Sequence, residues 1–407
     1  MGAAMRILYP VLWARPGRHA SQAQTAATAA ALSRAGHQVT LLVPQGRRDP
    51  LLTADDLRDW FAVEGDFRVV QRPSRWQGDF VLRTLMWLRQ VFRDPEVGGA
   101  DILYSRVPAM VGMGGFAPLP FATDHYRPWP DIYPAIRPTV RRTARQPHCL
   151  GFVIHSHYAA DAYLRSGVPA DRLLVAHNGF DRVGTLLEKA AARARLELPG
   201  ARPTAVYAGR VNAEKGLDTV LALADRRPEV LFVLVGSEGH GQIEQAAARR
   251  ENVRVVPWVA PEALAPWLCA ADVLLIPPSS EPLQRFRSCV LPIKLFTYLA
   301  AGRPILAPDA PDTRELLVHE ETALLVEPDR PDAAAAALDR LLGDSRLAGS
   351  LAQNALELAE GLSWDNRAEK ITAFLRQRYK QMASGGERPS YGGGAPAFSA
   401  PRNALDP

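Results

Sequence analysis

Short apolar segments alternate with Ala- and Leu-rich helical segments along most of this chain, and that alternation constrains the fold more than any other feature. Residues 5–11 read as an apolar strand and residues 21–34 as a helix, which Gly36 ends. Residues 38–43 read as the next strand. A strand, a helix and a second strand in that order form a unit whose two strands lie parallel. The sequence therefore predicts an α/β protein with parallel sheets.

The alternation stops once and then resumes, which predicts two domains in a chain of 407 residues. Residues 183–203 are rich in Glu, Ala and Arg and end in Leu-Pro-Gly-Ala-Arg-Pro, a composition typical of a linker. Ligands of parallel sheets bind beyond the carboxyl ends of the strands, so the predicted site is the cleft between the domains. The predicted division is a first domain at 1–185, a linker at 186–203, a second domain at 204–363, a final helix at 364–382 and a disordered tail at 383–407.

Composition excludes several classes of protein. The three cysteines show no CxxC or Cys/His spacing, which argues against a disulfide framework or a zinc site and suits a reducing cytoplasm. No apolar run reaches the ~18 residues of a membrane span, and we expect no signal peptide. Basic blocks interleaved with aromatic residues are missing, so we expect no nucleic-acid partner. The excess of basic residues in the first half is compatible with an anionic ligand, with peripheral contact at the inner face of a membrane, or with a solvated surface.

Lysine is rare in this chain, and its rarity singles out two positions. Only five of the 48 basic residues are lysine, so a lysine kept within a motif is a candidate for a role that needs a compact point charge. Lys215 follows Arg210 on the loop expected after the first strand of the second domain. Two cations on such a loop can grip a diphosphate and neutralise the charge of a departing phosphate. The alternative interpretation is a solvated turn.

The second lysine, Lys294, lies at the expected start of a helix. Pro292 suits the first turn of a helix, so the N–H groups from Leu291 through Ile293 to Lys294 would point outwards as an anion site. A lysine in the first turn opposes the helix dipole, which is favourable only if an anion occupies the site. The alternative interpretation is a surface lysine whose head group reaches solvent.

These two segments resemble motifs of the GT-B glycosyltransferases, specifically those of glycosyltransferase family 4. Gly209-Arg210 with Lys215-Gly216 is similar to the family's GRxxxxKG signature, and residues 299–305 resemble its MAxGxPV motif. Further resemblance to the family, in the order in which its motifs occur, covers residues 30–40, 156–168 and 175–181. The resemblance extends over most of the chain, which is identified as a member of that family.

The resemblance implies two Rossmann-like domains that face a central cleft, with the final helix crossing back onto the first domain. It implies a glycosyltransferase that moves a sugar from a nucleotide-diphosphate donor, such as a UDP-, GDP- or ADP-sugar, to an acceptor hydroxyl. The reaction would retain the anomeric configuration and would need no metal and no other cofactor. The acceptor would be a sugar, a lipid-linked glycan or a small molecule.

The same resemblance assigns roles to individual residues. Arg210 and Lys215 would bind the donor diphosphate and stabilise the leaving group, and His125 would contact the donor sugar or the acceptor. For His125 a buried structural histidine is the alternative. The expected donor-binding set consists of Gly17, Gly209, Gly236, Glu281, Ile293, Lys294 and Thr297.

Two positions depart from the family pattern. The family usually carries a pair of glutamates ahead of the MAxG glycine, and those positions here are Cys289 and Thr297. A threonine can still bond a ribose hydroxyl, but more weakly than a carboxylate. Glu281 is a candidate replacement for the sugar contact, or else a surface charge. The departures keep a second function open, a GT-B-shaped pseudoenzyme or nucleotide-sugar-binding scaffold without turnover.

Two other readings are weaker. A nicotinamide oxidoreductase is disfavoured because the first loop lacks GxGxxG. His155 and His157 flank Ser156 without the spacing of metal ligands, so both are read as structural. Ser156 itself is the predicted N-cap of a helix over residues 157–165.

Overall fold

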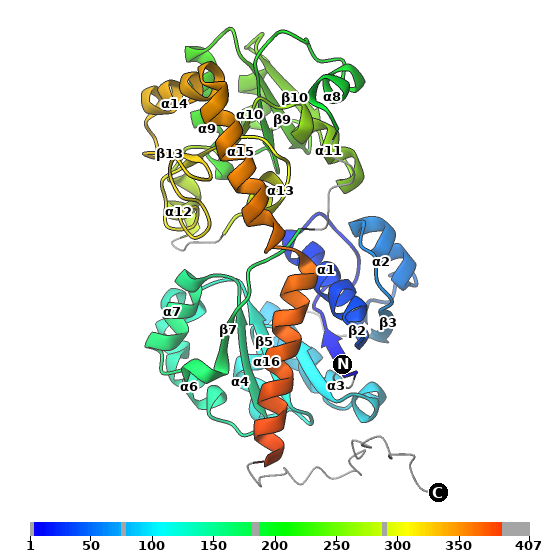
Figure 1. Ribbon diagram of the computed structural model, residues 1–407. Coiled ribbons are helices and arrows are strands. Elements are labelled where there is room, and N and C mark those ends of the chain that lie inside the picture. Colours follow the sequence, from blue (N-terminus) through cyan, green and yellow to red (C-terminus); the bar gives the residue numbers. More distant parts are fainter. Residues whose placement is uncertain (1–3, 75–78, 181–186, 287–290, 385–407) are drawn as a thin grey trace, which may run out of the picture.

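The computed structural model describes residues 4–74, 79–180, 187–286 and 291–384 (Figure 1). Within these ranges each half of the chain forms one parallel sheet with helices packed around it, and the halves are the lower and upper bodies of Figure 1. The two-domain α/β architecture predicted from the alternation of segments is therefore confirmed. Among the described helices, none is both long and apolar enough to cross a membrane.

The first domain contains a seven-stranded sheet in the order β3-β2-β1-β4-β5-β6-β7. Ile7 and Tyr9 enter one apolar cluster and Leu8 enters another, so both faces of this sheet are buried, as is usual for parallel strands. Its strands are β1 (Arg6–Pro10), β2 (Gln38–Gln45), β3 (Arg68–Pro73), β4 (Ile102–Ser105), β5 (Phe121–His125), β6 (Cys149–Ile154) and β7 (Leu173–Val175). Its helices are α1 (Ala20–Arg34), α2 (Ala54–Phe61), α3 (Phe80–Val91), α4 (Met110–Met113), α5 (Trp129–Ile132), α6 (Arg137–Ala144) and α7 (His157–Arg165).

The second domain contains a six-stranded parallel sheet in the order β10-β9-β8-β11-β12-β13. Val206 of β8 lies in the apolar cluster on one face and Tyr207 in the cluster on the other. Its strands are β8 (Thr204–Ala208), β9 (Leu231–Ser237), β10 (Val253–Pro257), β11 (Val273–Leu275), β12 (Ile305–Pro308) and β13 (Leu324–Val326). Its helices are α8 (Lys189–Arg195), α9 (Leu217–Arg226), α10 (Gln242–Ala247), α11 (Pro261–Ala270), α12 (Glu281–Phe286), α13 (Ile293–Leu299), α14 (Pro331–Gly343) and α15 (Ser345–Glu360).

The segment predicted as a linker is partly a helix of the second domain. α8 packs against α11, and Ala192 of α8 lies in the core of that domain. Arg193 is also buried and pairs with Asp272 at 2.5 Å. The Ala-rich composition that suggested a linker therefore belongs to a helix with one buried face. Residues 181–186 lie outside the described part of the chain.

The last helix, α16 (Trp364–Ser384), leaves the second domain and packs along the first (Figure 1). It contacts α1 and β6, and Ile371 and Leu375 are fully buried in the core of the first domain. The bridge between Phe180 and Ser363 lies where the chain crosses back. The helix includes Ala383 and Ser384, the first two residues of the predicted tail, and residues 385–407 lie outside the described part.

His37 ties α16 to the first strand through a neutral ring. Its Nδ1 accepts a hydrogen bond from the backbone N–H of Met5 at 3.1 Å, so its Nε2 carries the proton toward Thr372 Oγ1 at 2.8 Å. Burial and the nearby Arg376 lower the pKa of His37 to about 4. A protonated ring would lose the bond from Met5.

We therefore expect acid to destabilise the protein through His37. The unfolded chain binds a proton at this position below its ordinary pKa of about 6.5, and the folded chain does so only near pH 4. Stability is thus present above this window and falls by about 2 kcal/mol between pH 7 and pH 5 from this group alone. Urea unfolding at both pH values, compared with His37→Gln, measures it. An equal pH response in wild type and variant would contradict the prediction.

Candidate active site

A cavity of about 640 Å³ lies at the carboxyl ends of both sheets, where the two domains face each other. The first domain lines it with residues from the loop before α1 and from the ends of β5 and β6. The second domain lines it with the loop after β8 and the start of α13. This is the position predicted for the site from strand polarity. The lining includes Arg18, His19, Gln24, Tyr126, Arg127, His155, Ser156, Asn178, Gly209, Arg210, Lys215, Ile293, Lys294, Asp309 and Asp312.

Three cations from two loops meet at this cavity. Arg210 and Lys215 come from the loop after β8, and Lys294 comes from the first turn of α13. Lys294 Nζ lies 3.6 Å from the centre of the Tyr207 ring, a cation–π contact. Burial, reinforced by Lys215, holds the pKa of Lys294 well below its ordinary value. Among the described residues, no carboxylate lies within ion-pair distance of Lys294.

The pKa of Lys215 is lowered as well. Burial is the main cause, and the positive charges of Arg210 and Arg127 add to it, while Glu214 acts in the opposite direction. Arg210 makes a long contact to Glu238, at 3.7 Å. The arrangement therefore concentrates positive charge at the cavity, and an anion bound there would relieve the repulsion.

Two glycines allow the loop after β8 to pack closely against its neighbours. Gly209 has φ of +145° and Gly236 has φ of +115°, both unfavourable for residues with a side chain. A Cβ on Gly236 would lie 2.4 Å from the Gly209 carbonyl oxygen. A Cβ on Gly209 would lie 2.8 Å from Lys294 Nζ and 3.0 Å from Tyr207 Oη. The absence of a side chain at Gly209 thus makes room for Lys294, and its absence at Gly236 makes room for the backbone of Gly209.

Gly209→Ala is expected to weaken nucleotide binding by about 5- to 150-fold. The added methyl group must displace Lys294 or strain the backbone, at a cost of about 1–3 kcal/mol. Isothermal titration with UDP measures the loss. Gly200→Ala is the matched control, because its added methyl group would meet no atom within 4 Å. Equal affinity in both variants would contradict the role of Gly209.

His125 lies close to the cavity but does not line it. Its Nδ1 is 2.7 Å from Tyr163 Oη, and its ring packs against Phe152. Burial lowers the pKa of His125 to about 4, although Asp124 acts in the opposite direction, so the ring is neutral near pH 7. Its Nε2 has no hydrogen-bond partner among the described residues. The catalytic role of His125 stays a prediction, and the buried alternative describes its present contacts.

His155, after β6, is one of two histidines of the first domain that line the cavity, with His19 before α1. Its Nε2 is 2.6 Å from Asp124 Oδ1, and Asp124 Oδ2 in turn accepts from Arg367 of α16 at 2.7 Å and from Tyr104 Oη at 2.7 Å. Burial raises the pKa of Asp124, but Arg367 and then His155 outweigh it and keep the group ionised. Motif resemblance did not single out His155 for the site.

The structure separates the predicted donor-binding residues into two groups. Gly209, Ile293 and Lys294 line the cavity together with Arg210 and Lys215. Gly17, Gly236, Glu281 and Thr297 are outside its lining.

Three of the four residues outside the lining make hydrogen bonds or an ion pair with residues close to them in the sequence. Gly17 N–H donates to Gln22 Oε1 at 2.6 Å, and Thr297 Oγ1 donates to the Lys294 carbonyl at 3.0 Å. Glu281 lies 3.8 Å from Arg285 on the same helix. Cys289 lies outside the described residues.

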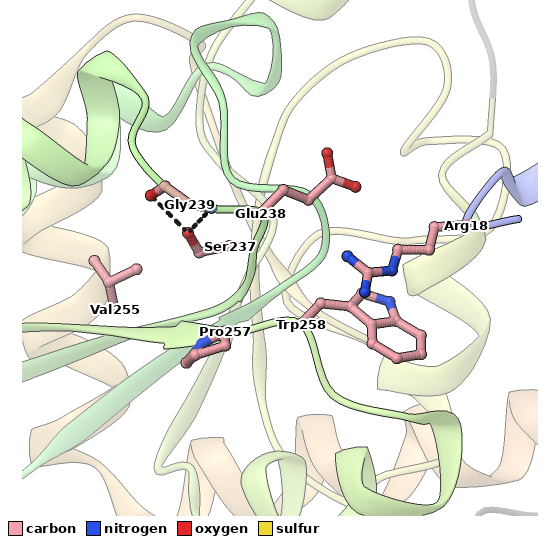
Figure 2. A pocket seen from close by; sticks show the side chains of 7 residues that line it. All are labelled: Arg18, Ser237, Glu238, Gly239, Val255, Pro257 and Trp258. Carbon is pink, nitrogen blue, oxygen red and sulfur yellow. Dashed lines mark hydrogen bonds between the residues drawn. The ribbon is translucent and has the colours of Figure 1, made fainter.

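A second pocket of about 360 Å³ lies beyond the loop after β9 (Figure 2). Trp258 forms one wall, and the Arg18 guanidinium from the first domain lies over its ring at 4.4 Å. Trp60 of α2 stacks on the same indole, with ring centres 6.4 Å apart. At the opposite wall the Gly239 N–H donates to Ser237 Oγ at 3.2 Å, and that hydroxyl lies 2.7 Å from Glu244 Oε1. Trp258 directly follows β10, and its position at the carboxyl end of a strand was the available signal for it.

The site can be compared with known proteins. A family model described as Glycosyltransferase Family 4 matches residues 22–182, and one described as Glycosyl transferases group 1 matches residues 202–344. D-inositol 3-phosphate glycosyltransferase of Streptomyces scabiei (strain 87.22) is 32% identical over 252 residues, which are 56% of this chain and 53% of that protein. Alpha-D-kanosaminyltransferase of Streptomyces kanamyceticus is 26% identical over 52% of this chain and 56% of its own length. The chain spans about half the length of the curated relatives it matches.

Solved structures share the fold at low sequence identity. Sucrose-phosphate synthase from Thermosynechococcus elongatus has a TM-score of 0.72 at 19% identity and covers 93% of this chain and 100% of its own. HepE of Anabaena, in complex with UDP and glucose, has a TM-score of 0.68 at 18% identity and covers 92% of this chain and 100% of its own. These similarities show the GT-B fold. The two family models together cover both domains, and the chain belongs to the GT-B glycosyltransferases of family 4, the glycosyl transferases of group 1.

Proposed function

We propose that this protein transfers a sugar from a nucleoside-diphosphate sugar, a UDP-sugar, to a hydroxyl group of an acceptor, with retention at the anomeric carbon and without a metal ion. One observation carries the proposal, namely the meeting of Arg210, Lys215 and Lys294 at the cleft of a chain from this family. Departure of a nucleoside diphosphate builds negative charge on its terminal phosphate. Preorganised cations in a site shielded from water stabilise that charge.

The position of the cations supports a metal-independent reaction. In many transferases a divalent ion bridges the diphosphate, whereas here we assign that role to the lysine and arginine side chains that line the cavity. Lys294 is held under Gly209 by packing and by the Tyr207 ring, so little reorganisation is needed when charge develops. Closure of the two domains around the donor would exclude water.

The uridine assignment rests on two observations. The smaller pocket beside Trp258 has one aromatic wall and polar groups opposite it, which suits a planar base with polar edges. The solved structures of HepE contain UDP, or UDP-glucose, and share the fold. We place the base in that pocket and the diphosphate over the three cations.

The acceptor is assigned only by class. The first domain offers Arg18, Arg127 and His155 at its side of the cavity, which suits a polar acceptor such as a sugar or another polyol. The curated relatives named for D-inositol 3-phosphate support this class. A lipid-linked glycan at the inner membrane face is a further candidate, supported by the basic excess of the first half of the chain. We propose a cytoplasmic location.

A second candidate function is donor binding without turnover. Thr297, at a position where the family carries a glutamate, donates its hydroxyl to the Lys294 carbonyl and does not line the cavity. The sugar contact that the glutamate would make is therefore unfilled at this position.

The test combines binding with turnover. Thermal shifts with UDP, GDP and ADP, each with and without EDTA, should show stabilisation by UDP that EDTA leaves unchanged and that Lys215→Ala abolishes. Release of UDP from UDP-sugars is then measured against a panel of polyol acceptors. Lys370→Ala, at an exposed lysine of α16, is the control. Stabilisation without turnover would favour the binding function, and no stabilisation by any nucleotide would overturn both.

A further inference from the structure

Two histidines and a glutamate from distant parts of the chain meet outside the cavity lining. His157 is the first residue of α7, and His177 follows β7, both in the first domain. Glu315 lies in the turn between β12 and β13 of the second domain. The potential ligand atoms of the three side chains all lie within 4.8 Å of one another. The cluster therefore spans the two domains.

Direct contacts hold the cluster together. His177 Nε2 lies 2.8 Å from Glu315 Oε1, and the two imidazole rings are 5.8 Å apart between centres. Glu315 Oε1 also accepts from the backbone N–H of His157 at 2.7 Å, and Oε2 accepts from that of Tyr158 at 3.3 Å. Glu315 thus caps the start of α7. It does so through backbone N–H groups, so this cap does not involve the His157 ring.

Glu315 has acceptor capacity left. A carboxylate has about four lone-pair sites. The contacts to His157, Tyr158 and His177 use three of them, and a metal bound between His177 and Glu315 would replace the shared proton.

We propose that His157, His177 and Glu315 form a binding site for a divalent transition metal, Zn²⁺, that ties the two domains together. Two imidazole nitrogens and one carboxylate oxygen are a ligand set that zinc accepts in proteins, with a fourth position left to water. The geometry places the ligands on both domains, so the bound metal stabilises the arrangement of domains in which they meet. None of the three residues lines the cavity that Arg210, Lys215 and Lys294 line, and the inference does not depend on the proposed function.

Sequence spacing could not reveal the site. His157 stands beside Ser156 with no second ligand at a metal-binding interval, which led to its reading as structural. The N-cap prediction itself is correct, because Ser156 Oγ accepts from the Ala159 N–H at 3.1 Å. The fold brings the other two ligands to His157, namely His177 from the same domain and Glu315 from the second domain.

The experiment measures metal binding on the full chain without an affinity tag. Titration calorimetry with Zn²⁺ should show one ion bound per chain, and Co²⁺ should give the visible absorption of a low-coordinate nitrogen and oxygen site. His157→Ala and His177→Ala should each weaken binding by at least about tenfold, since even changes in groups that only orient a metal ligand cost 10–100-fold. His157→Ala keeps the backbone N–H that Glu315 accepts from, so helix capping and folding persist in it.

The controls separate this site from adventitious binding. His240→Ala removes an exposed histidine on another loop and should leave Zn²⁺ affinity unchanged. Glu315→Ala, which removes the only ligand from the second domain, should abolish the stabilisation that Zn²⁺ gives in thermal unfolding. The proposal is overturned if wild type binds no Zn²⁺, or if His157→Ala and His177→Ala bind it as wild type does. It is also overturned if His240→Ala loses as much affinity as they do.

Discussion

Lys294→Met is expected to make the protein more stable and almost inactive. In the wild type no described carboxylate lies within ion-pair distance of the Lys294 amine at the cavity, and burial, reinforced by Lys215, holds its pKa well below the ordinary value. Met has a similar volume and no charge, so it should pack on the Tyr207 ring and raise the free energy of unfolding by about 1–3 kcal/mol. The leaving-group charge would lose one of its three cations, and kcat should fall by about 10²–10³.

The same lysine couples donor binding to pH. In the unliganded protein the pKa of Lys294 is low, and a diphosphate beside it would favour the charged form and raise that pKa. Binding of UDP therefore takes up protons between the two pKa values, and affinity falls as the pH rises through that window. Calorimetry in buffers of different ionisation enthalpy detects the uptake, which Lys294→Met should lack.

The control for both measurements is Lys370→Met. Lys370 is exposed on α16 and far in sequence from the site, so its replacement should change neither kcat nor proton uptake. A Lys294→Met variant that is less stable than wild type, yet retains transfer activity, would show that the lysine serves the fold and not the leaving group.

Much of the fold could be predicted because hydrophobic periodicity reports burial directly. Strands such as β8 and β9 are buried along their whole length and stand out as apolar runs. β3 lies at the edge of its sheet, has no fully buried residue, includes the exposed Arg68 and the half-exposed Arg72, and offers no such run. The sequence did not predict the helix α8, because its composition is also typical of linkers. Its burial depends on α11, which no local pattern encodes.

The residues of the candidate site could be predicted where a motif fixes the course of the backbone. They could not be predicted where the direction of a side chain decides whether it faces the site. Arg210, Lys215 and Lys294 come together because two loops of one sheet meet at its carboxyl end. Successive residues of a strand point to opposite faces, so Asp124 joins the network with His155 while His125 packs against Tyr163. The order of residues at the end of β5 could not by itself distinguish these two directions.

Arg367→Met is expected to lower the free energy of unfolding by about 3–5 kcal/mol, because it leaves Asp124 ionised, buried and without its cation. The side chains of both residues are almost fully buried, at 2% and 0% exposure. Urea unfolding followed by circular dichroism measures the loss. In the double variant with Asp124→Asn the charge is removed together with its partner, and the loss should be smaller than the sum of the two single losses.

Arg34→Met provides the matched control for this pair, because Arg34 of α1 also reaches α16. Its guanidinium lies 2.7 Å from Asp365, whose side chain is 58% exposed, so the pair is solvated and its loss should cost about 1 kcal/mol or less. Equal losses for Arg34→Met and Arg367→Met would show that the Asp124 pair contributes no more than a surface contact. A much larger loss for Arg367→Met would mean that the buried ion pair between Arg367 and Asp124 anchors α16 to the first domain. Because Asp124 also bonds His155, the same ion pair would hold both α16 and the His155 side of the cavity in place.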